Sequence, residues 1–162
     1  MKLFRQFMHV SIRCNDIDKS IDFYNKLGFE VILDMSKNPG DKPWNYYLRI
    51  KRGEYIELQA LSRQAPNPYL TPDQVVNNSN RSLWHFALET ENLRFTIDNL
   101  RQNGITVWKD PSKHAPVEDY DKDVFRSVGG YDVAWLVDPD GNPIEMMQPV
   151  GVTLQQKNDY DD

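Results

Sequence analysis

The hydrophobic and polar positions of the chain follow first the period of a strand and then that of a helix, and this succession occurs twice. Residues 7–13 alternate as a strand with one buried face does. Beyond them apolar residues recur at helical spacing, at Ile17, Ile21, Tyr24 and Leu27. Asn15 and Asp16 are common helix caps, and Gly28 suits the left-handed residue that ends many helices. The pattern predicts a strand followed by a helix that begins near Asp18.

The second half repeats this pattern in phase. Gly104 follows His85 at the same separation at which Gly28 follows His9, and apolar residues again precede the glycine at helical spacing. The corresponding residues of the two halves are Ile17 and Leu93, Ile21 and Ile97, Tyr24 and Leu100, and Gly28 and Gly104. We interpret the chain as a duplication.

Three strands are predicted after each helix. In the first half they cover residues 29–35, 46–51 and 54–60, and in the second half residues 106–109, 132–137 and 143–148. Gly53 and the turn sequence of residues 138–142 join the last two strands of each half. Each half is therefore β-α-β-β-β. Neither half can bury both faces of its sheet alone, so we predict an α+β fold in which tandem βαβββ modules form a curved mixed sheet around a shared cleft.

The remaining segments complete the predicted domain map. We expect a single domain over residues 1–150, with module one at about 5–61, a linker at 62–82 and module two at about 83–148. The proline-bearing linker has room for one short helical turn near residues 73–76. The acidic tail, residues 151–162, is expected to be disordered. The long loop at 111–131 suits either a lid beside the cleft or a solvated surface loop.

Composition and charge limit the classes of function. The chain has 162 residues, a net charge of −5 and a sequence pI near 5.2, which argues against a general nucleic-acid binder. Its apolar runs are too short for a membrane span, and its N-terminus lacks the apolar core of a signal peptide. One cysteine, Cys14, excludes an internal disulfide framework and fits a reducing compartment. We expect a cytoplasmic protein.

One histidine and one glutamate stand at matching places in each half. They are His9 with Glu57, and His85 with Glu145. Two imidazoles and two carboxylates suit divalent ions such as Ni²⁺ or Zn²⁺, and also Co²⁺, Mn²⁺ or Fe²⁺. A solitary strand histidine is usually a hydrogen-bonded core residue, and alternation alone would let either glutamate face solvent. The matched placement instead favours a four-ligand metal site in the cleft.

These residues carry a resemblance to the vicinal oxygen chelate superfamily, the glyoxalase/bleomycin resistance/dioxygenase proteins. It extends from about Phe7 to Gln148, and its most specific segments are residues 15–29 and 138–145. The resemblance implies duplicated βαβββ modules, a divalent metal in the cleft and, usually, a homodimer whose clefts are formed within one chain or shared between two.

Within the superfamily, the order His, Glu, His, Glu resembles glyoxalase I, the lactoylglutathione lyase. The resemblance implies a metal-dependent lyase or isomerase that acts on an α-oxoaldehyde adduct or α-hydroxycarbonyl substrate through an enediolate. It places the metal on the four ligands, with Glu145 as first choice for the base and Glu57 as second. The alternatives are an epimerase or sugar isomerase, an Fe(II) extradiol dioxygenase, and a non-catalytic binding protein for a small molecule such as an antibiotic.

Two arginines are candidates for binding the substrate. Arg13 lies on the predicted strand face of His9, at the place where similar glyoxalases hold a substrate carboxylate. Arg126, before Gly129 and Gly130, resembles the basic, glycine-bearing loop that grips an acidic substrate tail in that family. Trp44, Tyr46, Tyr47, Trp84 and Trp135 suit either a pocket or the core. His114 is expected on the surface, and Cys14 packed rather than reactive.

Overall fold

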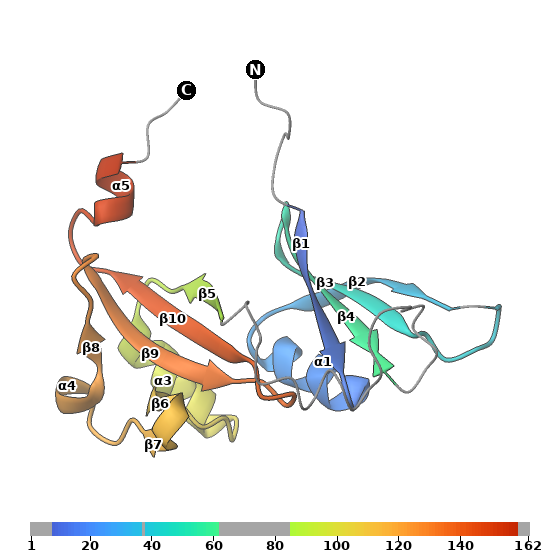
Figure 1. The fold of residues 1–162 in the computed structure, drawn as a ribbon, viewed down its shortest axis with the longest axis horizontal. Coiled ribbons are helices and arrows are strands. Elements are labelled where there is room, and N and C mark those ends of the chain that lie inside the picture. Colours follow the sequence, from blue (N-terminus) through green and yellow to red (C-terminus); the bar gives the residue numbers. More distant parts are fainter. Residues whose placement is uncertain (1–7, 37, 62–84, 159–162) are drawn as a thin grey trace. The chain divides into compact units, whose positions relative to one another are not determined.

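The chain forms two compact units, residues 1–81 and 82–162. The structure, a computed structural model, describes residues 8–36, 38–61 and 85–158 (Figure 1). The predicted linker, its helical turn and Trp84 lie outside the described residues. Each unit is an α+β arrangement of one mixed sheet with helices, which confirms the predicted fold class.

The first unit follows the predicted β-α-β-β-β order. Its elements are β1 (His9–Cys14), α1 (Ile17–Lys26), β2 (Glu30–Met35), β3 (Asn45–Lys51) and β4 (Glu54–Ala60). The sheet order is β1-β4-β3-β2, with β1 parallel to β4 and the other pairs antiparallel. Asp16 caps α1 by accepting a hydrogen bond from the Lys19 amide, and Gly28 follows with φ 93°, as the sequence predicts.

The second unit repeats the same topology. Its principal elements are β5 (Phe86–Glu89), α3 (Leu93–Gln102), β6 (Trp108–Asp110), β9 (Tyr131–Val137) and β10 (Pro143–Pro149). The order β5-β10-β9-β6 matches β1-β4-β3-β2, and β5 is likewise parallel to β10. The predicted duplication of a βαβββ unit is therefore confirmed.

In each unit one face of the sheet packs against the helix and carries the apolar core, and the candidate site residues lie on the other face. Leu48, Ile56 and Leu58 are buried in the first unit, where α1 contacts β4 and β2. Leu136, Ile144 and Met146 are buried in the second unit, where α3 contacts β10 and β9. Because side chains alternate along a strand, the residues between these positions lie on the opposite face. Both histidines and both glutamates of the predicted metal site belong to that opposite face.

The loop at 111–131 is more structured than predicted. It contains a 3-10 turn, η2 (Pro111–Lys113), the strand β7 (Ala115–Pro116), the helix α4 (Tyr120–Asp123) and the strand β8 (Phe125–Arg126). β7 pairs with β6, and β8 pairs with β9. The Asp123 carboxylate stabilises the segment by accepting hydrogen bonds from the Glu118 and Asp119 amides and from Lys109. The segment therefore extends the second sheet.

The prediction of a disordered tail is wrong for residues 154–158, which form the short helix α5 (Leu154–Asn158). Thr153 and Gln156 form a capping box, because each backbone amide donates to the other's side-chain oxygen. The Thr153 hydroxyl also bonds Tyr131 Oη, and Thr153 is fully buried. Residues 159–162 lie outside the described residues. In the part of the chain that the structure describes, no helix has the length and apolar character needed to span a membrane.

The position of Leu58 on the central strand β4 leads to a stability prediction. We expect Leu58→Ala to lower the free energy of unfolding by about 2–5 kcal/mol, because its fully buried side chain would leave a cavity. Leu33→Ala on the edge strand β2, where the side chain is half exposed, is the matched control and should cost no more than about 1 kcal/mol. Urea unfolding of both variants measures the difference, and equal losses would contradict the assignment of the core face.

Candidate metal and substrate site

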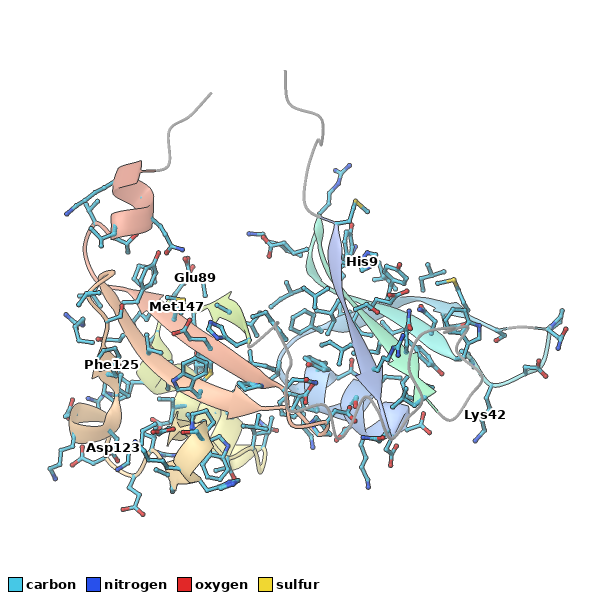
Figure 2. All side chains as sticks on the ribbon, in the orientation of Figure 1. His9, Lys42, Glu89, Asp123, Phe125 and Met147 are labelled. Carbon is cyan, nitrogen blue, oxygen red and sulfur yellow. The ribbon has the colours of Figure 1, made fainter. Side chains whose placement is uncertain are left out.

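The structure brings His9 and Glu57 together in the first unit. His9, labelled in Figure 2, opens β1. Glu57 lies on the neighbouring parallel strand β4, opposite Ser11. The two side chains therefore share a face of the sheet, and His9 Nε2 lies 3.6 Å from Glu57 Oε2. Only 10% of the Glu57 side chain is exposed.

The second unit brings His85 and Glu145 together in the same way. His85 precedes β5, and Glu145 lies on the parallel strand β10, opposite Ala87. The distance from His85 Nε2 to Glu145 Oε2 is 3.5 Å. An aromatic ring meets each imidazole edge-on: Tyr47 at 5.2 Å from His9 and Trp135 at 5.1 Å from His85, between ring centroids. The two predicted halves of the site are thus built alike.

The donor set and its spacing fit a metal ion. Two donors held by one ion at about 2.0–2.2 Å lie roughly 3–3.5 Å from each other, so small movements of the side chains would suffice in either pair. His9 Nδ1 is buried and has no hydrogen-bond partner within the described residues. Each unit supplies one pair; among the described residues, no three His, Cys, Asp or Glu side chains gather as a metal-binding group. A four-ligand centre remains a prediction.

Four side chains surround the Glu57 carboxylate with hydrogen-bond donors. Asn45 Nδ2 donates to Oε1 at 2.5 Å and Gln59 Nε2 donates to Oε2 at 3.1 Å. Burial raises the pKa of Glu57, but hydrogen bonds from Ser11, Asn45 and Tyr47, together with the charge of His9, more than offset that effect and leave the pKa below its ordinary value. Burial and the charge of Glu57 in turn raise the pKa of Tyr47.

The sequence pattern did not assign Asn45, Gln59 or Ser11 to the site. Their role depends on strand register, since Ser11 lies opposite Glu57 on β1 and Asn45 lies opposite Gln59 across the β3–β4 pair. Polar residues at two-residue spacing beside a buried glutamate are the signal that could have found them.

The two arginines lie in different surroundings. Arg13 follows His9 and Ser11 on the same face of β1, and its Nη1 is buried without a hydrogen-bond partner in the described part of the chain. Arg126 is exposed on β8 and pairs with Asp132 on β9, so its charge is already partly balanced. Arg13 is therefore the better placed of the two to receive an anion.

The remaining candidate residues are Cys14, His114 and the predicted pocket aromatics. Cys14 is fully buried and its thiol faces the Ile12 carbonyl oxygen, so it is packed. His114 is exposed and meets the edge of Trp108. Four of the predicted pocket aromatics lie in the described part of the chain, and all four are half-buried: Trp44, Tyr46, Tyr47 and Trp135. Two of them border the imidazoles, Tyr47 at His9 and Trp135 at His85.

Known proteins resemble this chain in sequence and in fold. A lactoylglutathione lyase of Arabidopsis thaliana is 26% identical over 144 residues, which are 89% of this chain and 44% of that protein. The chain thus spans less than half the length of this plant relative. A probable lactoylglutathione lyase of Synechocystis is 25% identical, with 87% of this chain and 93% of the relative covered. The crystal structure of a glyoxalase family protein from Enterococcus faecalis has the same fold, with a TM-score of 0.62 at 22% identity, and covers 91% of this chain and all of that one.

The family comparison agrees with the duplicated modules and the paired histidine and glutamate residues. The model that describes the Glyoxalase/Bleomycin resistance protein/Dioxygenase superfamily matches residues 6–146, which cover most of both units and include all four candidate ligands. The chain belongs to this superfamily.

Proposed function

We propose that the protein is a glyoxalase I-like, metal-dependent lyase or isomerase. The observation that carries the proposal is the repeated pair: His9 with Glu57 and His85 with Glu145, at equivalent positions of two sheets with the same topology. The distant likeness to lactoylglutathione lyases supports the same class of reaction. The substrate would be an α-oxoaldehyde thiol adduct or a related α-hydroxycarbonyl compound.

The four paired residues would hold a divalent cation, and glyoxalase I-like members of the superfamily typically use one. Two imidazoles and two carboxylates favour Ni²⁺ or Zn²⁺, with Co²⁺, Mn²⁺ or Fe²⁺ also suited. When bound, such an ion polarises a carbonyl or hydroxyl oxygen and stabilises the negative charge that forms when the neighbouring C–H proton is removed.

The carboxylates of the site would move the proton. In an adduct of a 2-oxoaldehyde with a thiol, the carbon that bears the hydroxyl and the sulfur loses its hydrogen, and the adjacent carbonyl carbon gains one. No oxidant is needed, because the first carbon becomes a thioester carbonyl while the second becomes an alcohol. Glu145 is the first choice for the group that takes the proton and returns it, and Glu57 is the second.

Arg13 would select the substrate by its charge. A buried guanidinium nitrogen without a partner in the described residues, on the face that carries His9 and Glu57, suits a substrate carboxylate. Arg126 stays the second candidate, and it would have to exchange its pairing with Asp132 for the substrate.

An epimerase or sugar isomerase is the second candidate function. The presence of one carboxylate in each pair favours it, because an epimerase needs an acid and a base that act on opposite faces of one carbon. Identification of the product separates the two functions. A thioester identifies the lyase, and an inverted stereocentre identifies the epimerase.

The quaternary structure and location belong to the same proposal. The superfamily resemblance supports a homodimer that acts on a small molecule, and the buried, reduced Cys14 suits the cytoplasm. The acidic pI of about 5.2 argues against nucleic acid as a partner. Light scattering and the retention of metal by the dimer would test the assembly.

We expect Glu145→Gln to lower kcat at least about 100-fold, because a general base typically accelerates proton transfer by that much or more. The test measures thioester formation under argon from the adduct of methylglyoxal and glutathione, with Ni²⁺ or Zn²⁺ added. Glu54→Gln, which removes a carboxylate paired with Lys51 in the β3–β4 hairpin, is the control and should retain full activity. Near-normal kcat in Glu145→Gln would refute the base assignment. In a separate assay in air, oxygen consumption by the wild-type protein with Fe²⁺ would point to a dioxygenase.

We expect Arg13→Met to raise KM for a carboxylate-bearing substrate about 10-fold or more, with a smaller effect on kcat. A hydrogen-bonded ion pair with a charged group contributes about 1.5–3 kcal/mol, and each 1.4 kcal/mol is a factor of ten. Arg126→Met is the comparison variant, and its KM should change less because Asp132 already pairs with this arginine. The reverse order of the two effects would assign the substrate's acidic group to Arg126.

A further inference from the structure

The two glutamates of the site occupy equivalent positions in their sheets. Glu57 lies opposite Ser11 on the parallel strand and opposite Tyr47 on the antiparallel strand. Glu145 lies opposite Ala87 and Trp135 in the corresponding places. Any difference between the two carboxylates must therefore come from the side chains around them.

Four positions neighbour Glu57 on its face of the sheet, and each carries a side chain that can donate a hydrogen bond: Ser11, Asn45, Tyr47 and Gln59. Asn45 Nδ2 donates to Oε1 at 2.5 Å and Gln59 Nε2 donates to Oε2 at 3.1 Å. Ser11 and Tyr47 carry hydroxyl groups at the two positions opposite Glu57. The carboxylate is thus held from both sides, with its two oxygens in fixed places.

Around Glu145, the same four positions carry side chains that donate nothing to it. The counterparts of Ser11, Asn45, Tyr47 and Gln59 are Ala87, Val133, Trp135 and Met147, in that order. Met147 is labelled on β10 in Figure 2. Within the described residues, the polar contact of Glu145 is His85 at 3.5 Å, and no hydrogen bond to its carboxylate is formed. Of the two side chains, Glu145 is also the more exposed, at 19% against 10%.

Asn45 provides an independent sign that the support of Glu57 is functional. It is fully buried, and its Oδ1 atom has no hydrogen-bond partner among the described residues. Burying an amide with one unsatisfied end is unfavourable, and the second unit fills the equivalent place with valine. Stability alone would favour an apolar residue there, so the position of the Asn45 amide is better explained by the carboxylate that it holds.

We infer that Asn45 and Gln59 are positioning residues that hold the Glu57 carboxylate in place as a metal ligand, a support that the equivalent residues of the second unit do not give Glu145. The inference rests on the proposed function. A carboxylate with both oxygens bonded to fixed donors loses those bonds if it swings away. The two amides would therefore keep the Glu57 carboxylate in the position in which it binds the metal.

Exchanging residues between the two halves tests the inference in the full-length protein. Asn45→Val and Gln59→Met give Glu57 the surroundings of Glu145. We expect each to weaken binding of Ni²⁺, Zn²⁺ and Co²⁺ about 10–100-fold, as the loss of a group that orients a metal ligand typically does. Competition with a chromophoric chelator measures Kd, and the visible spectrum of bound Co²⁺, which should shift, reports the ligand geometry.

The reverse exchange should have the opposite effect. Met147→Gln places a donor beside Glu145 where Gln59 stands beside Glu57. We expect Kd for the metal to become tighter or to stay within about 3-fold of wild type, because the added amide would hold the Glu145 carboxylate as Gln59 holds that of Glu57. Thermal unfolding with a chelator present identifies a variant that fails to fold. Gln59→Met and Met147→Gln affect half-buried positions, and they keep the test available if Asn45→Val does not fold.

The results separate failure of the inference from failure of the proposed function. If the wild-type protein binds none of the three metals, the proposed function fails. If it binds them and Gln59→Met and Asn45→Val leave both Kd and the Co²⁺ spectrum unchanged, the positioning role is overturned. A Kd more than about 3-fold weaker in folded Met147→Gln would likewise overturn it.

Discussion

The candidate site depends on the register with which the first strand of each unit pairs with the last. In the first unit the parallel pairing of β1 with β4 sets Ser11 against Glu57, and His9 then lies two residues earlier on the same face. In the second unit β5 and β10 pair with the same register, so His85 and Glu145 meet in the same way. A slip by one residue would turn each glutamate to the other face of its sheet, where the apolar core lies. The buried residues on that core face oppose such a slip.

Features that depend on local sequence or on the repeat could be predicted, whereas side-chain contacts that depend on strand register alone could not. The helical spacing of the apolar residues and the cap at Asp16 indicated α1, and the repeat of the pattern indicated the second unit. Asn45 was assigned no role from the sequence, because its role depends on a hydrogen bond to Glu57 on the adjacent strand. The helix α5 was missed for a different reason. Its capping box, formed by Thr153 and Gln156, is a local signal, but the acidic composition of the tail led to a prediction of disorder.

The two units have kept one backbone arrangement while their polar faces have diverged. The position of Arg13 on β1 corresponds to Glu89 on β5, since each lies two residues beyond the partner of a site glutamate. The first unit therefore carries a cation beside His9 and Glu57, and the second unit carries an anion beside His85 and Glu145. The side chains around the two glutamates also differ between the units: hydrogen-bond donors surround Glu57, and their counterparts around Glu145 donate no hydrogen bond to it. A duplicated scaffold supplies symmetric places for ligands, and substitutions that leave the strand pairing intact can then give each half a separate task.

The hydrogen bonds around Glu57 also prepare the site before any metal binds. A carboxylate that is largely buried would ordinarily hold its proton more tightly, but the bonds from Ser11, Asn45 and Tyr47 keep the pKa of Glu57 below its ordinary value. Near neutral pH the side chain is therefore ionised and already oriented, so a cation displaces no proton from it and orders no loose side chain. The organisation of the ligand is established during folding. If Glu57 binds the proposed metal, the ion would therefore meet a ligand that needs no rearrangement.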